Sequence, residues 1–322
     1  MTKAAPVDLR LPALRRFAIA ITVVNLLGHL WFGFEQSWAQ MFTALFTAYA
    51  LEIGFEFLDA WAVNRPTRFG ARFRDWVDFM LPAHITGLAI GMLLYAGDRL
   101  LPFMFAAAVG IGSKAIFTAP VGRSRRHFLN PSNAGLAISF MLFTESVQVA
   151  PPYMFTENFK DIGDWVLPGI IVCTGTFLNW KFTRRLPLAL GWLGSWALLA
   201  VARSLIFDVP FTNQITAMTG TAFVLFTFYM VTDPGTTPSI PWRQVVFGAC
   251  VALGHFIFVA FHISFGMFFS LLCVCTIRGV ALNLLALRAQ PGSHMPAVPA
   301  AELKAAAVQL TDLAGERSHK VA

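Results

Sequence analysis

Two short motifs place polar side chains beside a proline at the edge of an apolar stretch. Asn-Pro-Ser-Asn at 130–133 leads into one such stretch, and Thr-Asp-Pro-Gly-Thr-Thr-Pro at 232–238 leaves another. Asn130 or Ser132 can cap a helix whose first turn accepts proline. The backbone amides at that helix start can hold an anionic or carbonyl-rich ligand. A simple cap and turn is the alternative for each motif, but two such motifs on one side of the molecule favour a binding site.

A third feature is a row of acids within an apolar stretch. Glu52, Glu56 and Asp59 follow the spacing i, i+4, i+7 and therefore share one helix face. An acid at the centre of a membrane helix costs on the order of 2.5–3.5 kcal/mol, so this face is expected to point into the protein. A path for protons or cations through Glu52 and Glu56 is one interpretation. Hydrogen bonds between helices, to His29, His84 or an arginine, are the other.

The remaining chemistry-bearing residues form no familiar site. The four cysteines lie in apolar stretches without a CxxC pair, so neither a disulfide scaffold nor a zinc site is indicated. The sequence has no nucleophile elbow, Walker loop or dinucleotide fingerprint. We therefore expect no metal, assign no catalytic residue and expect no nucleic-acid partner.

The motifs lie among apolar segments long enough to cross a bilayer. Hydrophobic residues make up 57% of the 322 residues and charged residues only 13%, against about 25% charged in soluble domains. This composition excludes a disordered chain and argues against a soluble enzyme. A crossing needs about 20 mainly apolar residues. Ten segments meet this requirement: 17–35, 41–60, 79–97, 101–119, 132–149, 165–180, 186–206, 215–232, 244–262 and 264–286.

The positive charges indicate an orientation for these ten segments. The formal net charge is +7, and nearly all of the 24 Lys and Arg residues lie in the termini and in alternate connections. Arg99, Lys160 and Arg203 are the exceptions on the other side. By the positive-inside rule, this segregation predicts a protein of the bacterial cytoplasmic membrane with both termini in the cytoplasm. We expect a cytoplasmic segment at 1–16, a transmembrane domain at 17–288 and a flexible, Ala- and Pro-rich cytoplasmic tail at 289–322.

The membrane domain contains a weak internal repeat. His-Ile-Thr-Gly-Leu-Ala-Ile at 84–90 and Ala-Met-Thr-Gly-Thr-Ala-Phe at 217–223 share a Thr-Gly, which we expect to open an apolar helix in each case. The copies lie in the third and the eighth segment, an offset of five, and an odd offset inverts the second copy relative to the first. The predicted fold is an all-α polytopic membrane protein of about ten helices in two inverted five-helix repeats, about 17–149 and 165–286.

Both motif regions resemble one protein family. Residues 218–238, with Arg243 and Phe-Gly at 247–248, resemble the second-half signature of the RnfD/NqrB family. These are membrane subunits of the Rnf and sodium-pumping NADH:quinone oxidoreductase complexes. The first-half signature is matched by Ile-Thr-Gly-Leu at 85–88, Ser-Lys-Ala-Ile-Phe at 113–117 and Asn-Pro-Ser-Asn-Ala-Gly at 130–135. The segments 30–40, 127–133 and 150–158 are similar to the UnbU-like branch, whose members are encoded with enediyne biosynthesis and in other bacteria.

The resemblance implies a flavin in the membrane domain and electron transfer to unidentified partner subunits, so the chain would be a component of a membrane oxidoreductase. Better-known members attach FMN to the last Thr of a Ser/Thr-Gly-Ala-Thr motif after the fifth span. The corresponding loop, 144–164, lacks that motif, so a non-covalent flavin, FMN or riboflavin, is expected. Its candidate polar contacts are Lys114 as a charge partner, Asn130, Asn133, Thr219, Thr232, Asp233 and Thr237.

Two other functions are compatible with the same residues. An inverted-repeat transporter or channel for a small solute or a biosynthetic product, without flavin, would use the acid face and the paired turns. A non-catalytic membrane scaffold has no feature in its favour. In every case the lipid bilayer is a partner.

Overall fold

The computed structural model describes residues 10–70, 72–122, 124–151, 155, 158 and 165–289. The chain divides into two compact units, 1–281 and 282–322. Residues 1–9 of the predicted N-terminal segment, most of the loop at 152–164 and the predicted tail from 290 onward lie outside the described residues.

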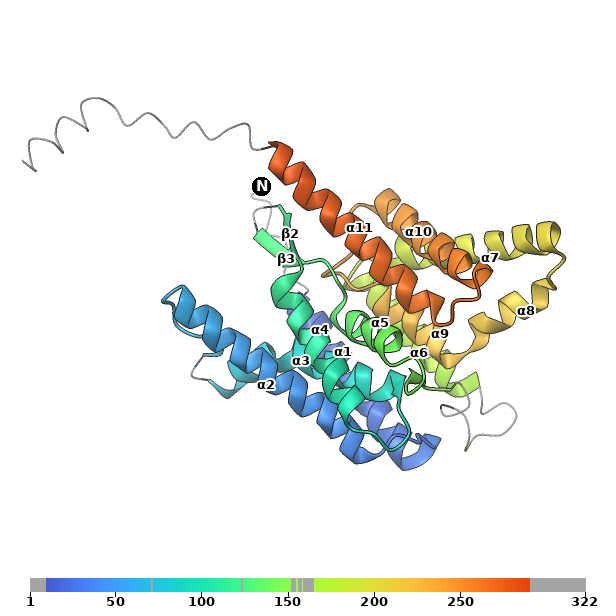
Figure 1. The fold of residues 1–322 in the computed structure, drawn as a ribbon. Helices are drawn as coiled ribbons and strands as arrows, with labels where there is room; N and C mark the ends of the chain where they lie inside the picture. Colours follow the sequence, from blue (N-terminus) through green and yellow to red (C-terminus); the bar gives the residue numbers. More distant parts are fainter. Residues whose placement is uncertain are drawn as a thin grey trace, which may run out of the picture. The chain divides into compact units, whose positions relative to one another are not determined.

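Helices dominate the described chain (Figure 1). In chain order they are α1 (Arg10–Leu27), continued by the π-helix η1 (Gly28–Phe32), α2 (Trp38–Ala62), α3 (Phe73–Leu93), α4 (Leu101–Ile116), α5 (Pro131–Leu142), α6 (Val166–Lys181), α7 (Leu186–Phe207), α8 (Phe211–Thr216), the 3₁₀ turn η4 (Ala217–Thr219), α9 (Thr221–Leu225), the π-helix η5 (Phe226–Met230), α10 (Pro241–Ala260) and α11 (Gly266–Ala289). Two short antiparallel pairs join β1 (Leu94–Tyr95) to β4 (Gln148–Val149) and β2 (Thr118–Val121) to β3 (Ser124–His127).

Six of the described helices are long and apolar enough to cross a membrane. They are Leu11–Phe32, α2, α3, α7, α10 and α11, and the two stretches Leu101–Ile116 and Thr221–Met230 are apolar but shorter. The all-α class and the presence of several membrane-length helices agree with the prediction. The count of ten crossings stays a prediction.

Three of the predicted spans differ from the observed helices. The spans at 101–119 and 132–149 are shorter, because α4 ends at Ile116 and α5 at Leu142, and strand pairs follow. Pro120, which has no backbone N–H to continue a helix, lies in β2. The span at 215–232 is interrupted: its helix stops at η4 and restarts after Gly220, which has an extended backbone and forms the N-cap of α9.

The expected helix start at the first Thr-Gly is wrong. Thr86 and Gly87 lie inside α3, where the Thr86 hydroxyl donates to the carbonyl of Pro82 at 2.8 Å and the helix continues. A Cβ on Gly87 would lie 2.8 Å from the Cα of Leu45, so this glycine permits close packing against α2. Only the second Thr-Gly begins a helix, and the two copies of the dipeptide therefore have different roles.

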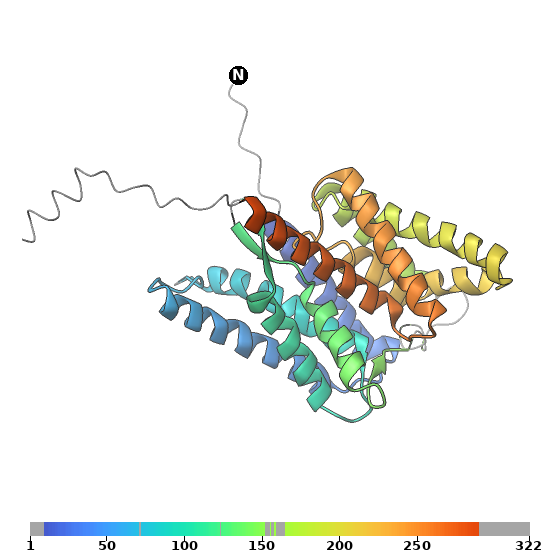
Figure 2. The ribbon, with the colours of Figure 1, turned by 45° about the horizontal axis from the view of Figure 1, so that its top comes forward.

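Within the first unit, helices pack in two sets (Figure 2). The helix α2 packs against α3 and α4, while α4 packs against α5 and α1 against α3. In the second set, α6 packs against α9 and η5, and α7 against α10. Helix α5 also packs against α11 and the residue before it: Asn133 donates to the carbonyl of Phe268 at 3.0 Å, and the rings of Phe140 and Phe265 stack with centroids 4.6 Å apart.

The α7–α10 pair depends on glycine. A Cβ added to Gly191 would lie 2.7 Å from the Cα and carbonyl oxygen of Val245, and a Cβ on Gly248 would lie 2.6 Å from the backbone of Leu188 and Trp192. Such contacts of backbone with backbone are typical of helices that associate in lipid, where small residues allow close approach.

We expect Gly191→Val to lower the free energy of unfolding by about 2 kcal/mol, because the two helices must move apart. Thermal unfolding in a mild detergent measures this loss. The matched control is Gly194→Val on the same helix, since nothing lies within 4 Å of a Cβ at that position. Equal melting temperatures for the two variants would contradict this account of the packing.

Candidate functional site

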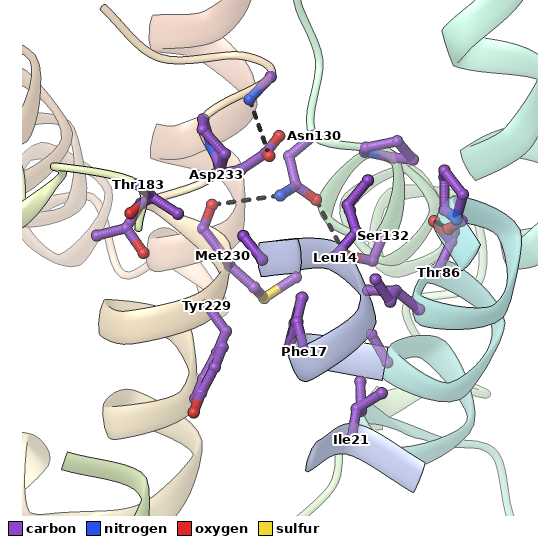
Figure 3. A pocket seen from close by; sticks show the side chains of 18 of the residues that line it. Leu14, Phe17, Ile21, Thr86, Asn130, Ser132, Thr183, Tyr229, Met230 and Asp233 are labelled. Atoms are coloured by element: carbon purple, nitrogen blue, oxygen red, sulfur yellow. Dashed lines mark hydrogen bonds between the residues drawn. The ribbon is translucent and has the colours of Figure 1, made fainter. Parts of the chain in front are cut away.

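A large cavity lies among the helices at the two motif regions (Figure 3). Its volume is about 1360 Å³. Helix α1 forms one wall with Leu14, Phe17 and Ile21, and the opposite wall comes from α6, the segment after it, and η5. Charged side chains and residues of both motifs also line it. The cavity therefore combines apolar walls with charged and hydrogen-bonding groups.

Asn130 connects the first motif to the end of η5, two residues before the second motif. Its side-chain oxygen accepts hydrogen bonds from the Ser132 hydroxyl at 2.9 Å and from the backbone N–H of Asn133 at 3.0 Å. It is thus the N-cap of α5, as the sequence predicts, with Pro131 in the first turn. Its side-chain nitrogen donates to the carbonyl of Met230 at 3.2 Å, across 100 residues of chain. One side chain thus fixes the start of α5 against the end of η5.

The turn after η5 is held by hydrogen bonds on every side. Asp233 accepts from the N–H of Gly235 at 3.0 Å and from the Thr236 hydroxyl at 2.9 Å. Arg185, buried in the connection between α6 and α7, donates to the Thr237 hydroxyl at 3.0 Å. Arg278 of α11 donates to the carbonyl of Thr236 at 2.9 Å. The carboxylate of Asp233 therefore stabilises its own turn and also lines the cavity.

The acids of α2 are all paired with bases. Lys114 of α4 contacts both carboxylate oxygens of Glu52, at 2.6 and 2.7 Å. The buried Glu56 accepts from the Arg65 guanidinium at 2.7 Å and from the backbone N–H of Arg68 at 2.6 Å. Asp59 is also paired with Arg65 and Arg68. The acid face takes part in hydrogen bonds to other segments, and the ion path through Glu52 and Glu56 stays a prediction.

His84 has hydrogen-bond partners other than the acids of α2. The Thr22 hydroxyl donates to the carbonyl of Ala18 at 2.7 Å and contacts the Nε2 of His84 at 2.7 Å, so it accepts the Nε2 proton. The Nδ1 atom accepts the hydroxyl proton of Tyr49 at 2.6 Å. This histidine therefore connects α1, α2 and α3 and is not the partner of the acids.

The predicted contact residues divide into two groups. The cavity is lined by Lys114, Asn130, Thr232 and Asp233, together with Glu52 and Glu56. Three others do not line it: Asn133 contacts α11, Thr237 holds Arg185, and the exposed Thr219 donates only to the carbonyl of Thr216. The structure thus brings Lys114, Asn130, Thr232 and Asp233 to one cavity, and leaves Asn133, Thr219 and Thr237 outside its lining.

Sequence reasoning missed the aromatic part of the site. Phe17 and Tyr229 stack with centroids 4.8 Å apart and point into the same space in Figure 3. The Tyr229 hydroxyl lies 3.0 Å from that of Thr174. Tyr229 belongs to the π-helix η5, and π-helical turns are frequent at functional sites. No signal in the sequence distinguishes this π-helical register from an ordinary helix.

His127 at the end of β3 lies in the charged part of the cavity wall. Burial lowers the pKa of its imidazole below the ordinary value, because the charged form loses solvation. Asp233 and Glu52 oppose this effect, while Lys114 and Arg126 add to it. The side chain is therefore neutral at pH 7 and can both donate and accept a hydrogen bond.

Among the residues that the structure describes, no group of three His, Cys, Asp or Glu side chains is arranged to hold a metal ion. No family model matches the sequence. No curated protein matches it either.

We expect the Glu52–Lys114 pair to show strong coupling. Glu52→Gln or Lys114→Met alone leaves a half-buried charge without its partner, and the free energy of unfolding should fall by about 3 kcal/mol. The double variant should recover about 1–2 kcal/mol of that loss, as measured by thermal unfolding of all four proteins. Losses that simply add in the double variant would show that the two charges do not interact.

We expect His127 to make the protein less stable in acid. Its pKa is lowered in the folded state, so the unfolded chain binds the proton more tightly. The stabilising contribution is complete above the unfolded pKa of about 6.5 and is lost as the pH falls from there toward the folded pKa. The difference in melting temperature between about pH 7.5 and about pH 5.5 should therefore be smaller for His127→Gln than for the parent protein. An unchanged difference would exclude His127 as the titrating group.

Proposed function

We propose that this chain is an integral membrane subunit that binds a flavin non-covalently in the cavity and relays electrons within a membrane redox system. The observation that carries the proposal is that residues of both motifs line one cavity, beside the hydrogen bond from Asn130 to Met230. A flavin ring needs a flat apolar wall and a few hydrogen-bonding groups along its polar edge. The rings of Phe17 and Tyr229 offer the first, and Asn130, Thr232 and His127 offer the second.

The motifs that line the cavity are those that resemble the RnfD/NqrB family, closest to its UnbU-like branch. In this proposal Lys114, Asn130, Thr232 and Asp233 contact or orient the flavin. The loop 144–164 has no Ser/Thr-Gly-Ala-Thr motif, and we therefore propose a flavin that is not covalently attached. The protein supplies burial and orientation, while electron transfer is the chemistry of the flavin itself. Its donor and acceptor are unidentified partner subunits.

The proposed fold is two inverted five-helix repeats in a bacterial cytoplasmic membrane, with both termini in the cytoplasm. Helix pairing supports the repeat: the first helix of each half packs on the third (α1 on α3, α6 on α9 and η5), and the second packs on the fourth (α2 on α4, α7 on α10). The charged residues that line the cavity include basic residues of connections assigned to the cytoplasm. The flavin would therefore lie near the cytoplasmic face.

A transporter for a small solute is the second candidate, because the cavity is long. It extends from the exposed charges of Asp59 and Arg68 to the exposed apolar side chains of Val23 and Ile170. An ion route along α2 would have to break the Glu52–Lys114 pair, which makes electron transfer the better-supported function.

The test is flavin binding. Protein expressed with ample riboflavin and purified in a mild detergent should carry the visible absorption bands of a flavin. Tyr229→Leu removes one aromatic wall and should weaken binding about tenfold, since stacking of a ring on an aromatic side chain contributes about 1–3 kcal/mol. The control is Tyr95→Leu, because Tyr95 does not line the cavity. A folded protein that binds neither riboflavin nor FMN on titration would overturn the proposal, and solute uptake by proteoliposomes would then support the transporter.

A further inference from the structure

The cavity has an opening between α1 and α6. Val23 of α1 and Ile170 and Thr174 of α6 line the cavity and are also exposed. Helix α1 packs on α3, whereas α6 packs on α9 and η5, so the two helices belong to different sets. Exposed apolar side chains on membrane helices face the lipid. The apolar wall of the cavity therefore continues out to the bilayer through this opening.

Two cations lie at one end of the opening and are connected by two aromatic rings. The Arg16 guanidinium lies 4.3 Å from the centroid of the Phe182 ring, and the Lys181 amino group lies 5.6 Å from that of Phe177. The two rings meet edge to face with centroids 5.7 Å apart. Phe182 also lines the cavity. Arg16 of α1 and Lys181 of α6 thus belong to one cluster at the rim.

Neither cation of this cluster is neutralised by an acid. Both are exposed, and within the described part of the chain neither pairs with a carboxylate. The neighbouring Arg15, by contrast, pairs with Asp78. Arg16 donates to the carbonyl of Pro12 at 3.3 Å, which leaves its charge uncompensated. Two uncompensated cations at the rim of an opening attract an anion.

The apolar side of the opening has the length of one lipid leaflet. Val23 lies seven residues after Arg16, about 10 Å along the helix, and Ile170 lies eleven residues before Lys181, about 16 Å along α6. The hydrocarbon core of a bilayer is about 30 Å thick, so one leaflet spans about 15 Å. The opening therefore matches a molecule with an anionic head and an apolar chain of leaflet length.

We propose that the opening binds one anionic phospholipid, with its phosphate at Arg16 and Lys181 and an acyl chain along Val23, Ile170 and Thr174. Basic groups between membrane helices at the cytoplasmic side are a setting in which anionic headgroups bind. The positive-inside rule assigns both cations to that side. Guanidinium and ammonium groups each donate charge-assisted hydrogen bonds to phosphate. The lipid covers the side of the cavity, whatever ligand the cavity itself holds, so this inference is independent of flavin binding.

The experiment compares two phospholipids with identical acyl chains. Phosphatidylglycerol, which is anionic, and phosphatidylcholine, which is zwitterionic, are titrated into delipidated protein in detergent, and native mass spectrometry gives each Kd. The parent protein should bind one phosphatidylglycerol at least tenfold more tightly than phosphatidylcholine. Arg16→Gln and Lys181→Gln should each weaken phosphatidylglycerol binding about fivefold, since each cation near a membrane surface contributes about that factor. Equal Kd values for the two lipids in the parent protein would overturn the proposal.

A matched control separates this site from general attraction between basic residues and anionic lipid. Arg243 is also exposed and lies over an aromatic ring, that of Trp242, but neither residue lines the cavity. Arg243→Gln should leave the Kd of phosphatidylglycerol unchanged. A loss as large as that of Arg16→Gln would contradict a specific site. Arg16 and Lys181 are exposed, so unchanged melting temperatures of their variants will show that lost binding does not come from misfolding.

Two further measurements test the acyl chain. Ile170→Trp fills the opening and keeps both cations, and it should weaken phosphatidylglycerol binding. Glycerol phosphate carries the anionic group without acyl chains and should not displace the lipid at an equal concentration. Displacement by glycerol phosphate, together with unchanged lipid binding by Ile170→Trp, would show a site for a free phosphate group and overturn the lipid site.

Discussion

The structure depends on how the carbonyl groups of the π-helix η5 are satisfied. Inside a membrane no water is available to accept or donate a hydrogen bond, so a helix that departs from the regular register must find protein donors. The carbonyl of Phe228 accepts from the side chains of Asn179 at 2.8 Å and Thr232 at 2.6 Å. The carbonyl of Met230 accepts from Asn130. Asn179 of α6 and Asn130 at the start of α5 thereby hold these two helices against η5. Residues of all three elements line the cavity.

The same requirement explains the charges around the cavity. An acid in an apolar helix is stable only when it is neutralised, and α2 meets this condition with Lys114 from α4 and with arginines from the connection to α3. The pairs join α2 to α4 and to the connection before α3, so neutralisation also fixes the geometry of the wall. Cations remain in excess along the cavity wall once the carboxylates are paired.

Sequence patterns predicted the features that depend on local chemistry. The apolar runs located the helices, Asn-Pro located the cap of α5, and the i, i+4, i+7 spacing indicated that acids of α2 face other segments. The rest depends on contacts between distant residues. The sequence pattern left His29, His84 or an arginine as partners of the acids and did not indicate Lys114, which is 62 residues from Glu52 and pairs with it because α4 packs on α2. The π-helical register of η5 and the break at Gly220 likewise depend on the donors that neighbouring helices supply.

Helix α1 shows how such a cavity can be kept open. Its polar contacts to other helices, Arg15 with Asp78 and Thr22 with His84, both lead to α3. On the opposite side it meets the second half of the chain through the Phe17–Tyr229 stack and through Arg16 over the Phe182 ring. Apolar contacts between membrane helices have little advantage over contacts with lipid tails, so they do not force the helices together. Directional bonds on one side and ring contacts on the other hold α1 at α3 and leave room between the halves. A flat aromatic ligand would extend the same kind of contact without breaking a hydrogen bond.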